Sequence, residues 1–363
     1  MGKANNSTIR SLFLALFLSI LTTSPILAAD GGGESEAEGP TDFIFHHVKD
    51  AYEWHFITIG HTHVTLPLPI ILYSEDRGLE VFMSSQFLDE DHHYIEHNGY
   101  RLTHEGGDLE AVDEGRTFYD LSITKNVFAM FISVAVMLII FLSIAKRYKN
   151  DPRTPPKGLQ SLLEPIILFV RDDIARPLIG EKKYKRFMPY LLTVFFFILI
   201  NNLLGLLPGA ANVTGNIAVT FVLAFITFVI TQFNGNKGYW MHIFKTPGVP
   251  WWLLPIMIPI EIVGLFTKPF SLMVRLFANI TAGHIIILSL IGLIFIFKSI
   301  ALGPVSVIFG TIMTFLELLV AFLQAYVFTL LSAIYFGGAV EEHDHEHEHD
   351  EKVPEMQQNS AMV

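Results

Sequence analysis

The dominant pattern in the sequence is a series of long apolar runs that follows a more polar first third. Five runs stand out, at residues 127–145, 187–207, 216–233, 251–297 and 304–336. A helix needs about 20 apolar residues to cross the hydrocarbon core of a bilayer. The first three runs each predict one membrane helix, and the last two, being longer, predict strongly tilted or oblique helices. The expected fold class is an all-α polytopic membrane protein with about five membrane-embedded helices, in a membrane domain at residues 121–340.

Charges between the runs predict how the helices are oriented. Lys146, Arg147 and Lys149 follow the first run, and basic residues favour the cytoplasmic side of a membrane. Residues 159–179 mix apolar and charged positions and predict an amphipathic helix on the cytoplasmic surface. Basic residues at 182–186 keep the next loop inside. The alternation of loops then places the C-terminus in the cytoplasm and the first domain outside.

The first 42 residues predict a leader and a linker. Lys3 and Arg10 precede a short apolar core at 12–21, and small residues follow it. This pattern is typical of a cleaved signal peptide at residues 1–29, with an uncleaved membrane anchor as the alternative. Residues 30–42, dominated by Gly, Glu and Ser, predict a flexible acidic linker.

Residues 43–120 predict a small extracytoplasmic domain with some β structure. Alternating stretches at 63–66 and 79–82 are typical of short strands. The domain holds nine of the 15 histidines in the chain. Because these histidines form no ligand set of recognised spacing, an ordinary His-rich surface is favoured over a metal site. Two histidine pairs carry the metal alternative: His61 with His63, and His92 with His93.

Composition supports a membrane protein and excludes other classes. Hydrophobic residues make up 51% of the chain and charged residues 16%, which is typical of polytopic proteins. The chain has no cysteine, so disulfides and zinc-thiolate sites are excluded. A net charge of -11 argues against nucleic-acid binding. The acidic, His-rich residues 341–363 predict a disordered tail, with metal scavenging as the alternative. No phosphate-binding loop occurs, so any nucleotide chemistry would belong to another chain. No cofactor is expected.

Arg275 lies deep inside one of the apolar runs. An arginine at the centre of a membrane helix costs at least ~2.5–3.5 kcal/mol, so it marks a candidate functional site. The alternative is an arginine that reaches a headgroup from a helix end. Apolar sequence continues on both sides of Arg275, which weakens that alternative.

Other polar residues recur around Arg275 at helical spacing. Glu261 and Lys268 precede it by fourteen and seven residues, so the three fall on one slowly drifting stripe of the helix. Asn279 lies one turn beyond on nearly the same face, whereas His284, at about 100° per residue, points to roughly the opposite side. On the last run, Glu317 and Gln324 are also seven residues apart. Two helices with facing polar stripes predict an ion path. The alternative for His284 and Glu317 is a buried hydrogen bond that only holds the two helices together.

The same segments resemble subunit a of F-type rotary ATP synthases, here of a bacterial kind. The motifs that carry the resemblance are Lys268-Pro-Phe-Ser-Leu-Met-Val-Arg275-Leu-Phe-Ala-Asn279, Phe322-Leu-Gln324-Ala-Tyr-Val-Phe and Asn201-Asn-Leu-Leu-Gly205-Leu-Leu-Pro208. The resemblance covers roughly residues 127–339. Ala278 departs from it, because the motif often has glycine there, and the outer domain and tail are not explained by it.

The resemblance implies a role for each candidate residue. Arg275 would be the essential gate arginine facing the rotor ring of c subunits, with Gln324 lying against it. Two half-channels would carry protons, Asn279 and Glu261 on the ATP-forming side and His284 and Glu317 on the opposite side. Asn216 is expected to be a further member of the proton pathway.

The resemblance also implies a role for the whole chain. The chain would be the stator subunit of the membrane sector, with no catalytic centre of its own. Its partners would be the c-subunit ring, b-type stator subunits, the rest of the ATP synthase and the lipid bilayer. It would lie in the bacterial inner membrane. His284 at the entry path favours protons over sodium ions.

Three other functions stay open at this point. A secondary ion-coupled transporter could place its substrate at Arg275, but such proteins typically show internal repeats, and none is visible. An intramembrane hydrolase would need metal-ligating histidines or a nucleophile motif, which the sequence lacks. A purely structural membrane subunit is the third alternative. Copurification with a small helical ring protein would separate the rotary function from all three alternatives.

Overall fold

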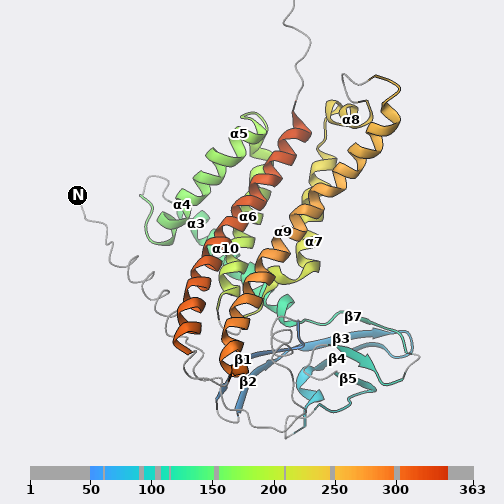
Figure 1. Cartoon of the computed structure of the whole chain (residues 1–363), viewed down its shortest axis with the longest axis vertical. Coiled ribbons are helices and arrows are strands. Elements are labelled where there is room, and N and C mark those ends of the chain that lie inside the picture. Colours follow the sequence, from blue (N-terminus) through green and yellow to red (C-terminus); the bar gives the residue numbers. More distant parts are fainter. Residues whose placement is uncertain are drawn as a thin grey trace, which may run out of the picture.

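The computed structural model describes residues 50–59, 62–89, 94–102, 108–113, 116–150, 155–207, 210–245, 250–297 and 303–341. The predicted signal peptide, linker and most of the tail lie outside these ranges, as do His61, His92 and His93. The described helices form a long bundle, and the strands gather beyond one end of it (Figure 1). The expected polytopic helical fold with a small β region is confirmed.

Seven short strands make up the β region in the described residues before the bundle. They form an antiparallel pair β1–β2, a three-stranded sheet in the order β4–β3–β7, and a second pair β5–β6. On β3, Ile70 and Leu72 are fully buried while Tyr73 is exposed, as expected for a strand with one face on the core. The strands are β1 Glu53–Ile59, β2 Thr62–Pro67, β3 Pro69–Ser74, β4 Gly78–Met83, β5 Tyr100–Leu102, β6 Leu109–Ala111 and β7 Phe118–Asp120.

Hydrogen bonds join the β region to the first helix of the bundle. Asp50 accepts hydrogen bonds from the Thr124 hydroxyl at 2.8 Å and from the Asn126 backbone at 3.0 Å. The Lys125 amide donates to the Ala51 carbonyl at 2.8 Å. These contacts satisfy donors at the start of that helix, which have no partner within the helix. The chain therefore enters the bundle at a fixed point of the β region.

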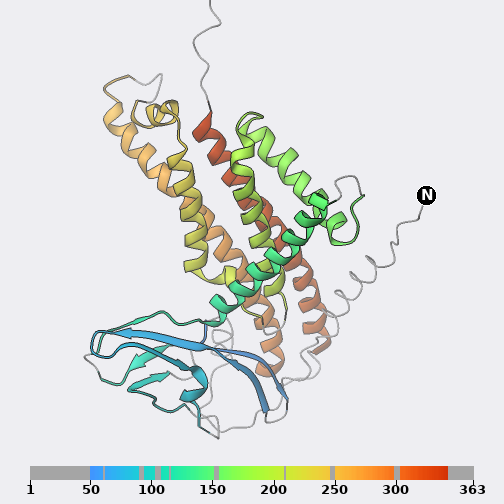
Figure 2. The ribbon, with the colours of Figure 1, turned by 180° about the vertical axis from the view of Figure 1, so that it is seen from behind.

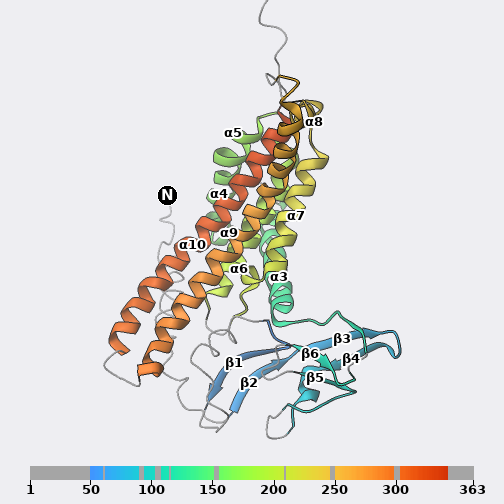
Figure 3. The same ribbon diagram turned by 45° about the vertical axis from the view of Figure 1, so that its right-hand side comes forward.

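Among the described residues, four helices are long and apolar enough to cross a membrane, or five if the bent pair α7 and α8 counts as one span. Helix α3 runs obliquely across the back of the bundle (Figure 2). The two longest helices, α9 and α10, have 44 and 38 residues and lie side by side (Figure 3). The bundle helices are α3 Lys125–Asn150, α4 Leu159–Phe169, α5 Arg176–Ile179, α6 Tyr184–Gly205, α7 Ile217–Phe233, α8 Lys237–Phe244, α9 Leu254–Phe297 and α10 Gly303–Val340.

The segment predicted as one amphipathic helix is divided in the structure. A π-helical stretch, η3 at Val170–Ala175, separates α4 from α5. Val170 and Ile174 are fully buried in the core of the bundle, whereas Arg171 and Arg176 form ion pairs with Asp172 on the exposed side. The segment is amphipathic as expected, and its apolar face packs on the other helices.

Close packing at the end of α10 depends on a residue without a side chain. A Cβ at Gly337 would lie 1.9 Å from the carbonyl oxygen of Leu178. No side chain fits at that distance, so glycine is required for α10 to approach α5. Nearby, the Phe187 and Phe336 rings stack with centroids 4.8 Å apart. These contacts fix the position of α10 against the rest of the bundle.

Candidate functional site

Helices α9 and α10 run antiparallel and are joined by polar contacts at three levels. The Lys268 ammonium lies 5.7 Å from the centroid of the Tyr335 ring. Further along, Asn279 Nδ2 donates to the side-chain oxygen of Gln324 at 2.9 Å. The third contact is a His–Glu pair described below. As the residue numbers rise along α9, the partner numbers fall along α10, so polar residues of the two helices face each other as predicted. The spacing had placed Asn279 with Arg275 and His284 on the opposite side, and this assignment is wrong, because Asn279 and His284 both contact α10.

His284 and Glu317 form a buried hydrogen-bonded pair. His284 Nδ1 lies 2.9 Å from Glu317 Oε1, and the side chains are 19% and 5% exposed. A buried carboxylate is strongly destabilising unless a partner satisfies it. Imidazole can hold or release a proton near neutrality, so the pair is suited to proton exchange. The geometry also fits a purely structural link between α9 and α10.

Gly283 makes room for that pair. A Cβ at residue 283 would lie 2.9 Å from Glu317 Oε1 and 3.2 Å from its carboxyl carbon. Both distances are shorter than ordinary van der Waals contacts. The glycine before His284 therefore allows the carboxylate to lie against the backbone of α9.

Arg275 differs from Asn279 and His284 in having no hydrogen bond or ion pair in the described ranges. It is exposed, while Leu272 and Leu276 beside it on the helix are buried. Other exposed side chains of this part of α9 are apolar, among them Phe270 and Val274. The side-chain oxygen of Gln324 accepts from Asn279, one turn away from Arg275. In the described residues the guanidinium therefore lies exposed, without a hydrogen bond or ion pair.

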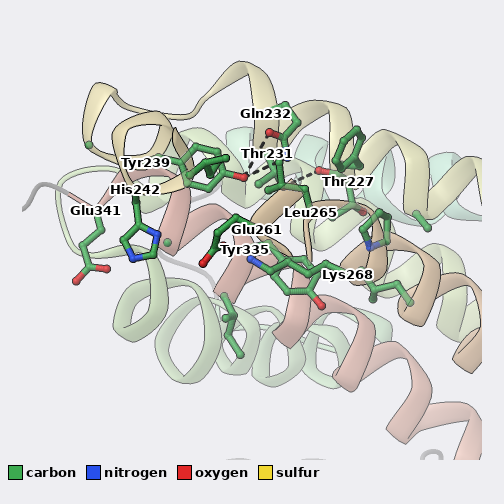
Figure 4. Close-up of a pocket in the computed structure, with 18 residues that line it drawn as sticks. Thr227, Thr231, Gln232, Tyr239, His242, Glu261, Leu265, Lys268, Tyr335 and Glu341 are labelled. Atoms are coloured by element: carbon green, nitrogen blue, oxygen red, sulfur yellow. Dashed lines mark hydrogen bonds between the residues drawn. The ribbon is translucent and has the colours of Figure 1, made fainter. Parts of the chain in front are cut away.

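A cavity of about 380 Å³ is lined by residues of α7, α8, α9 and α10, and α8 lies at the end of the bundle away from the strands (Figure 1). Glu261 and Lys268 contribute to its lining from α9. Figure 4 shows Glu261, Lys268 and Tyr335 gathered at its centre. Gln232 donates to the Tyr239 hydroxyl across it at 3.2 Å. The polar lining residues that the sequence did not single out are Thr227, Thr231, Gln232, Tyr239, His242, Tyr335 and Glu341.

Only part of this lining could have been found from the sequence. Thr220, Thr227 and Thr231 are buried on α7, and their spacing of seven and four places them on one face. That stripe is a signal that sequence reasoning missed. The residues on α8 and Tyr335 come from other helices, and no sequence pattern brings them together.

Asn216 lies apart from both polar groups. It precedes α7, and its side-chain oxygen accepts a hydrogen bond from the Ala218 amide at 2.9 Å. This is the usual geometry of an asparagine N-cap. The structure brings Asn216 neither to the cavity lining nor to the His284–Glu317 pair, so helix capping accounts for its place.

Asn202, which belongs to the Asn201–Pro208 motif, is a further buried polar residue. It is 3% exposed. Its Nδ2 donates to the Ala321 carbonyl of α10 at 3.3 Å, and its side-chain oxygen accepts from the Thr214 hydroxyl at 2.6 Å. Ala321 lies one turn from Glu317, so a buried polar link reaches α10 from the side of the strands. In the described residues, no group of three or more His, Asp or Glu could hold a metal ion.

These features define a polytopic membrane protein in which an outward-facing arginine lies between a polar cavity and a buried His–Glu pair. The sequence model of a family described as "ATP synthase A chain" matches residues 127–337. The chain belongs to this family, which confirms the predicted resemblance to subunit a of F-type ATP synthases. A second family, described as "Domain of unknown function (DUF8433)", matches residues 43–127.

Curated relatives agree with that family. The chain is 49% identical over 232 residues to "ATP synthase subunit a" of Chloroherpeton thalassium, covering 62% of this chain and 69% of the relative. It is 52% identical over 226 residues to "ATP synthase subunit a 2" of Prosthecochloris aestuarii, covering 60% and 69%. It is 46% identical over 246 residues to "ATP synthase subunit a" of Myxococcus xanthus, covering 66% and 79%.

Proposed function

We propose that this chain is the stator subunit in the membrane sector of a bacterial ATP synthase, where it couples proton flow to rotation of a c-subunit ring. The family supports membership of the ATP synthase. The observation that carries the finer proposal is Arg275, an exposed arginine in the middle of a long apolar helix. Such a charge requires a partner, and in the described residues this chain supplies none.

The partner we propose is a carboxylate on the ring. In contact with lipid that carboxylate must be neutral, because an unpaired charge there is very costly. When rotation brings it beside Arg275, the positive charge favours its ionised form, so a proton is released. Arginine does not give up its own proton under these conditions. Arg275 therefore acts as a fixed charge and neither carries nor relays the ion.

The cavity around Glu261 and Lys268 would serve as the inner half-channel. Its volume of about 380 Å³ is far above the ~10–15 Å³ that one water molecule requires. Carboxylate, amide, hydroxyl and imidazole groups in its lining could hold water by hydrogen bonds. We place its opening on the cytoplasmic side, because the basic residues after α3 predict that side by the positive-inside rule. The β region and residues 43–120 as a whole would then lie outside, in the periplasm.

The His284–Glu317 pair would belong to the outer half-channel. It lies nearer than Arg275 to the end of α9 that approaches the strands (Figure 1). A proton that arrives from outside would pass to His284, then to Glu317 and then to a ring carboxylate. Arg275 lies between this pair and the inner cavity along α9. Its positive charge would block a direct path for protons across the membrane, so each proton must travel with the ring.

A substitution at Arg275 tests the proposal in membrane vesicles that contain the whole complex. Arg275→Ala should abolish proton-driven ATP synthesis, while the chain still copurifies with the ring protein. Arg275→Lys keeps the charge but loses the planar guanidinium, so it should also be severely impaired. Val274→Ala changes an exposed apolar neighbour and should leave synthesis unchanged. Normal synthesis in the Arg275→Ala vesicles would refute the proposal. Carrying out the assay without sodium separates proton from sodium transport.

A further inference from the structure

A second, smaller cavity lies where the outer strands meet the membrane helices. Its volume is about 90 Å³. It differs from the inner cavity because one wall belongs to the outer domain. The lining comes from Trp54 on β1, from α3, from the end of α6 and from the turn that follows, and it comprises Trp54, Ala129, Ile132, Asn201, Leu204, Leu207, Ala210, Ala211 and Val213.

One residue of this lining, Asn201, carries an unsatisfied polar atom. Asn201 is 2% exposed, and its Nδ2 donates to the Phe197 carbonyl at 2.8 Å. Its side-chain oxygen is buried and has no hydrogen-bond partner among the described residues, and the same is true of Asn212 Nδ2 in the adjoining turn. A buried polar atom without a partner is costly, and a bound water is the usual remedy.

The neighbouring residue connects this cavity to the interior of the bundle. Asn202 follows Asn201 directly and is bonded both to Thr214 and to the Ala321 carbonyl of α10. Ala321 is one helical turn from Glu317. Asn202 thus brings a buried polar group of α6 to α10 one turn from Glu317.

Trp54 is the lining residue that comes from the β region. It is 9% exposed, and its ring meets that of Phe128 edge-on with centroids 6.0 Å apart. It packs with Ala129, Ala211 and Val213 in a small apolar cluster at the junction of the two domains. The indole that covers the cavity thus comes from the β region and not from the membrane helices.

We propose that this cavity is a hydrated vestibule at the outer mouth of the proton path, and that Trp54 of the outer domain restricts access to it. The occupants are water molecules held by Asn201 and exchanged with the outer solution. The vestibule supplies protons to His284 through the polar link at Asn202. The proton-feeding role rests on the proposed function. The water content and the role of Trp54 do not.

Thiol labelling tests the proposal directly, because the chain contains no cysteine. Leu204→Cys places one thiol in the lining of the cavity in the assembled complex. A charged, membrane-impermeant methanethiosulfonate applied to the outer face should label it. Labelling should be about tenfold faster when Trp54→Ala is added, the change that ~1.4 kcal/mol of lost barrier produces. Ile198→Cys lies on the same helix, is 0% exposed and does not line the cavity, so it should stay unlabelled.

Two results would overturn the inference. If the thiol at residue 204 reacts only after denaturation, in both backgrounds, the cavity is dry. If it reacts at the same rate with and without the indole, Trp54 does not restrict access. Trp54→Phe, which keeps an aromatic ring, should give an intermediate rate and guards against misfolding of the alanine variant. Labelling requires no rotation, so its outcome is independent of the Arg275 experiment.

Discussion

Replacing Gly283 with alanine should disturb the His284–Glu317 pair without weakening the helix that carries it. The new methyl group would lie 2.9 Å from Glu317 Oε1. Ordinary contacts begin near ~3.4 Å, so the carboxylate must retreat by about 0.5 Å. The Nδ1–Oε1 distance in the pair is 2.9 Å. The same retreat would stretch it toward ~3.5 Å, where a hydrogen bond is largely lost.

The two energetic effects of Gly283→Ala act in opposite directions. Losing a hydrogen bond to a charged or buried group costs ~1.5–3 kcal/mol. Alanine is better than glycine inside a helix by ~0.8–1.0 kcal/mol, which offsets part of that loss. The stability of the assembled complex should therefore fall only slightly. If proton transfer depends on the pair, the rate should fall roughly tenfold or more, since each ~1.4 kcal/mol is a factor of ten.

The assay compares proton-driven ATP synthesis in vesicles with the amount and thermal stability of the complex in the same vesicles. Gly264→Ala is the matched control, because it lies on the same helix and a Cβ there meets nothing within 4 Å. The control should keep full activity. If Gly283→Ala is as active as Gly264→Ala, the pair is only a structural link between α9 and α10, and the proposed outer relay fails.

Three further substitutions test the packing and the charges. Gly337→Ala places a Cβ 1.9 Å from a carbonyl oxygen of α5 and should lower the yield of folded protein sharply, whereas at Gly338 a Cβ meets nothing within 4 Å and alanine should be tolerated. Asn279→Leu removes the hydrogen-bond donor to the buried Gln324 on α10. Thermal unfolding should show that the free energy of unfolding falls by ~1–3 kcal/mol. The pKa of the Asp76 carboxyl lies below its usual value, because the carboxylate accepts a hydrogen bond from the Asp76 backbone amide and lies near the charge of Arg116. The ionised carboxylate therefore stabilises the outer domain above the usual pKa, and this is lost as pH falls through the folded-state pKa. Asp76→Asn should make outer-domain unfolding, followed by tyrosine fluorescence, less sensitive to acid.

The sequence predicts the helices well, because each long apolar run has few ways to satisfy its backbone in a membrane. The last two runs appear as α9 and α10. The rotation per residue also accounts for the opposite directions of Arg275, which is exposed, and His284, which contacts α10. Asn279 lies between these two directions, and its amide reaches α10 as well.

What the sequence could not predict depends on contacts between distant segments. The pairing of His284 with Glu317 requires a particular register of α9 against α10, and this register depends on packing at residues such as Gly283. The inner cavity combines residues from α7, α8, α9 and α10, so no local spacing reveals it. The π-helical stretch that divides residues 159–179 also had no signal in the pattern of apolar positions. The signal peptide and the tail stay predictions.

The direction of Arg275 bears on the choice between a rotary subunit and a transporter. A transporter binds its substrate between its own helices, so a substrate-binding arginine should line an internal cavity. In the described residues Arg275 lines neither the 380 Å³ cavity around Glu261 nor the smaller cavity beside Trp54, and it lies on the exposed face of α9. A permanent charge on a lipid-side face is stable only if another protein covers it with a compensating group. That requirement favours a rotating neighbour that presents one carboxylate after another, and an arginine found in contact with lipid alone in the assembled complex would contradict it.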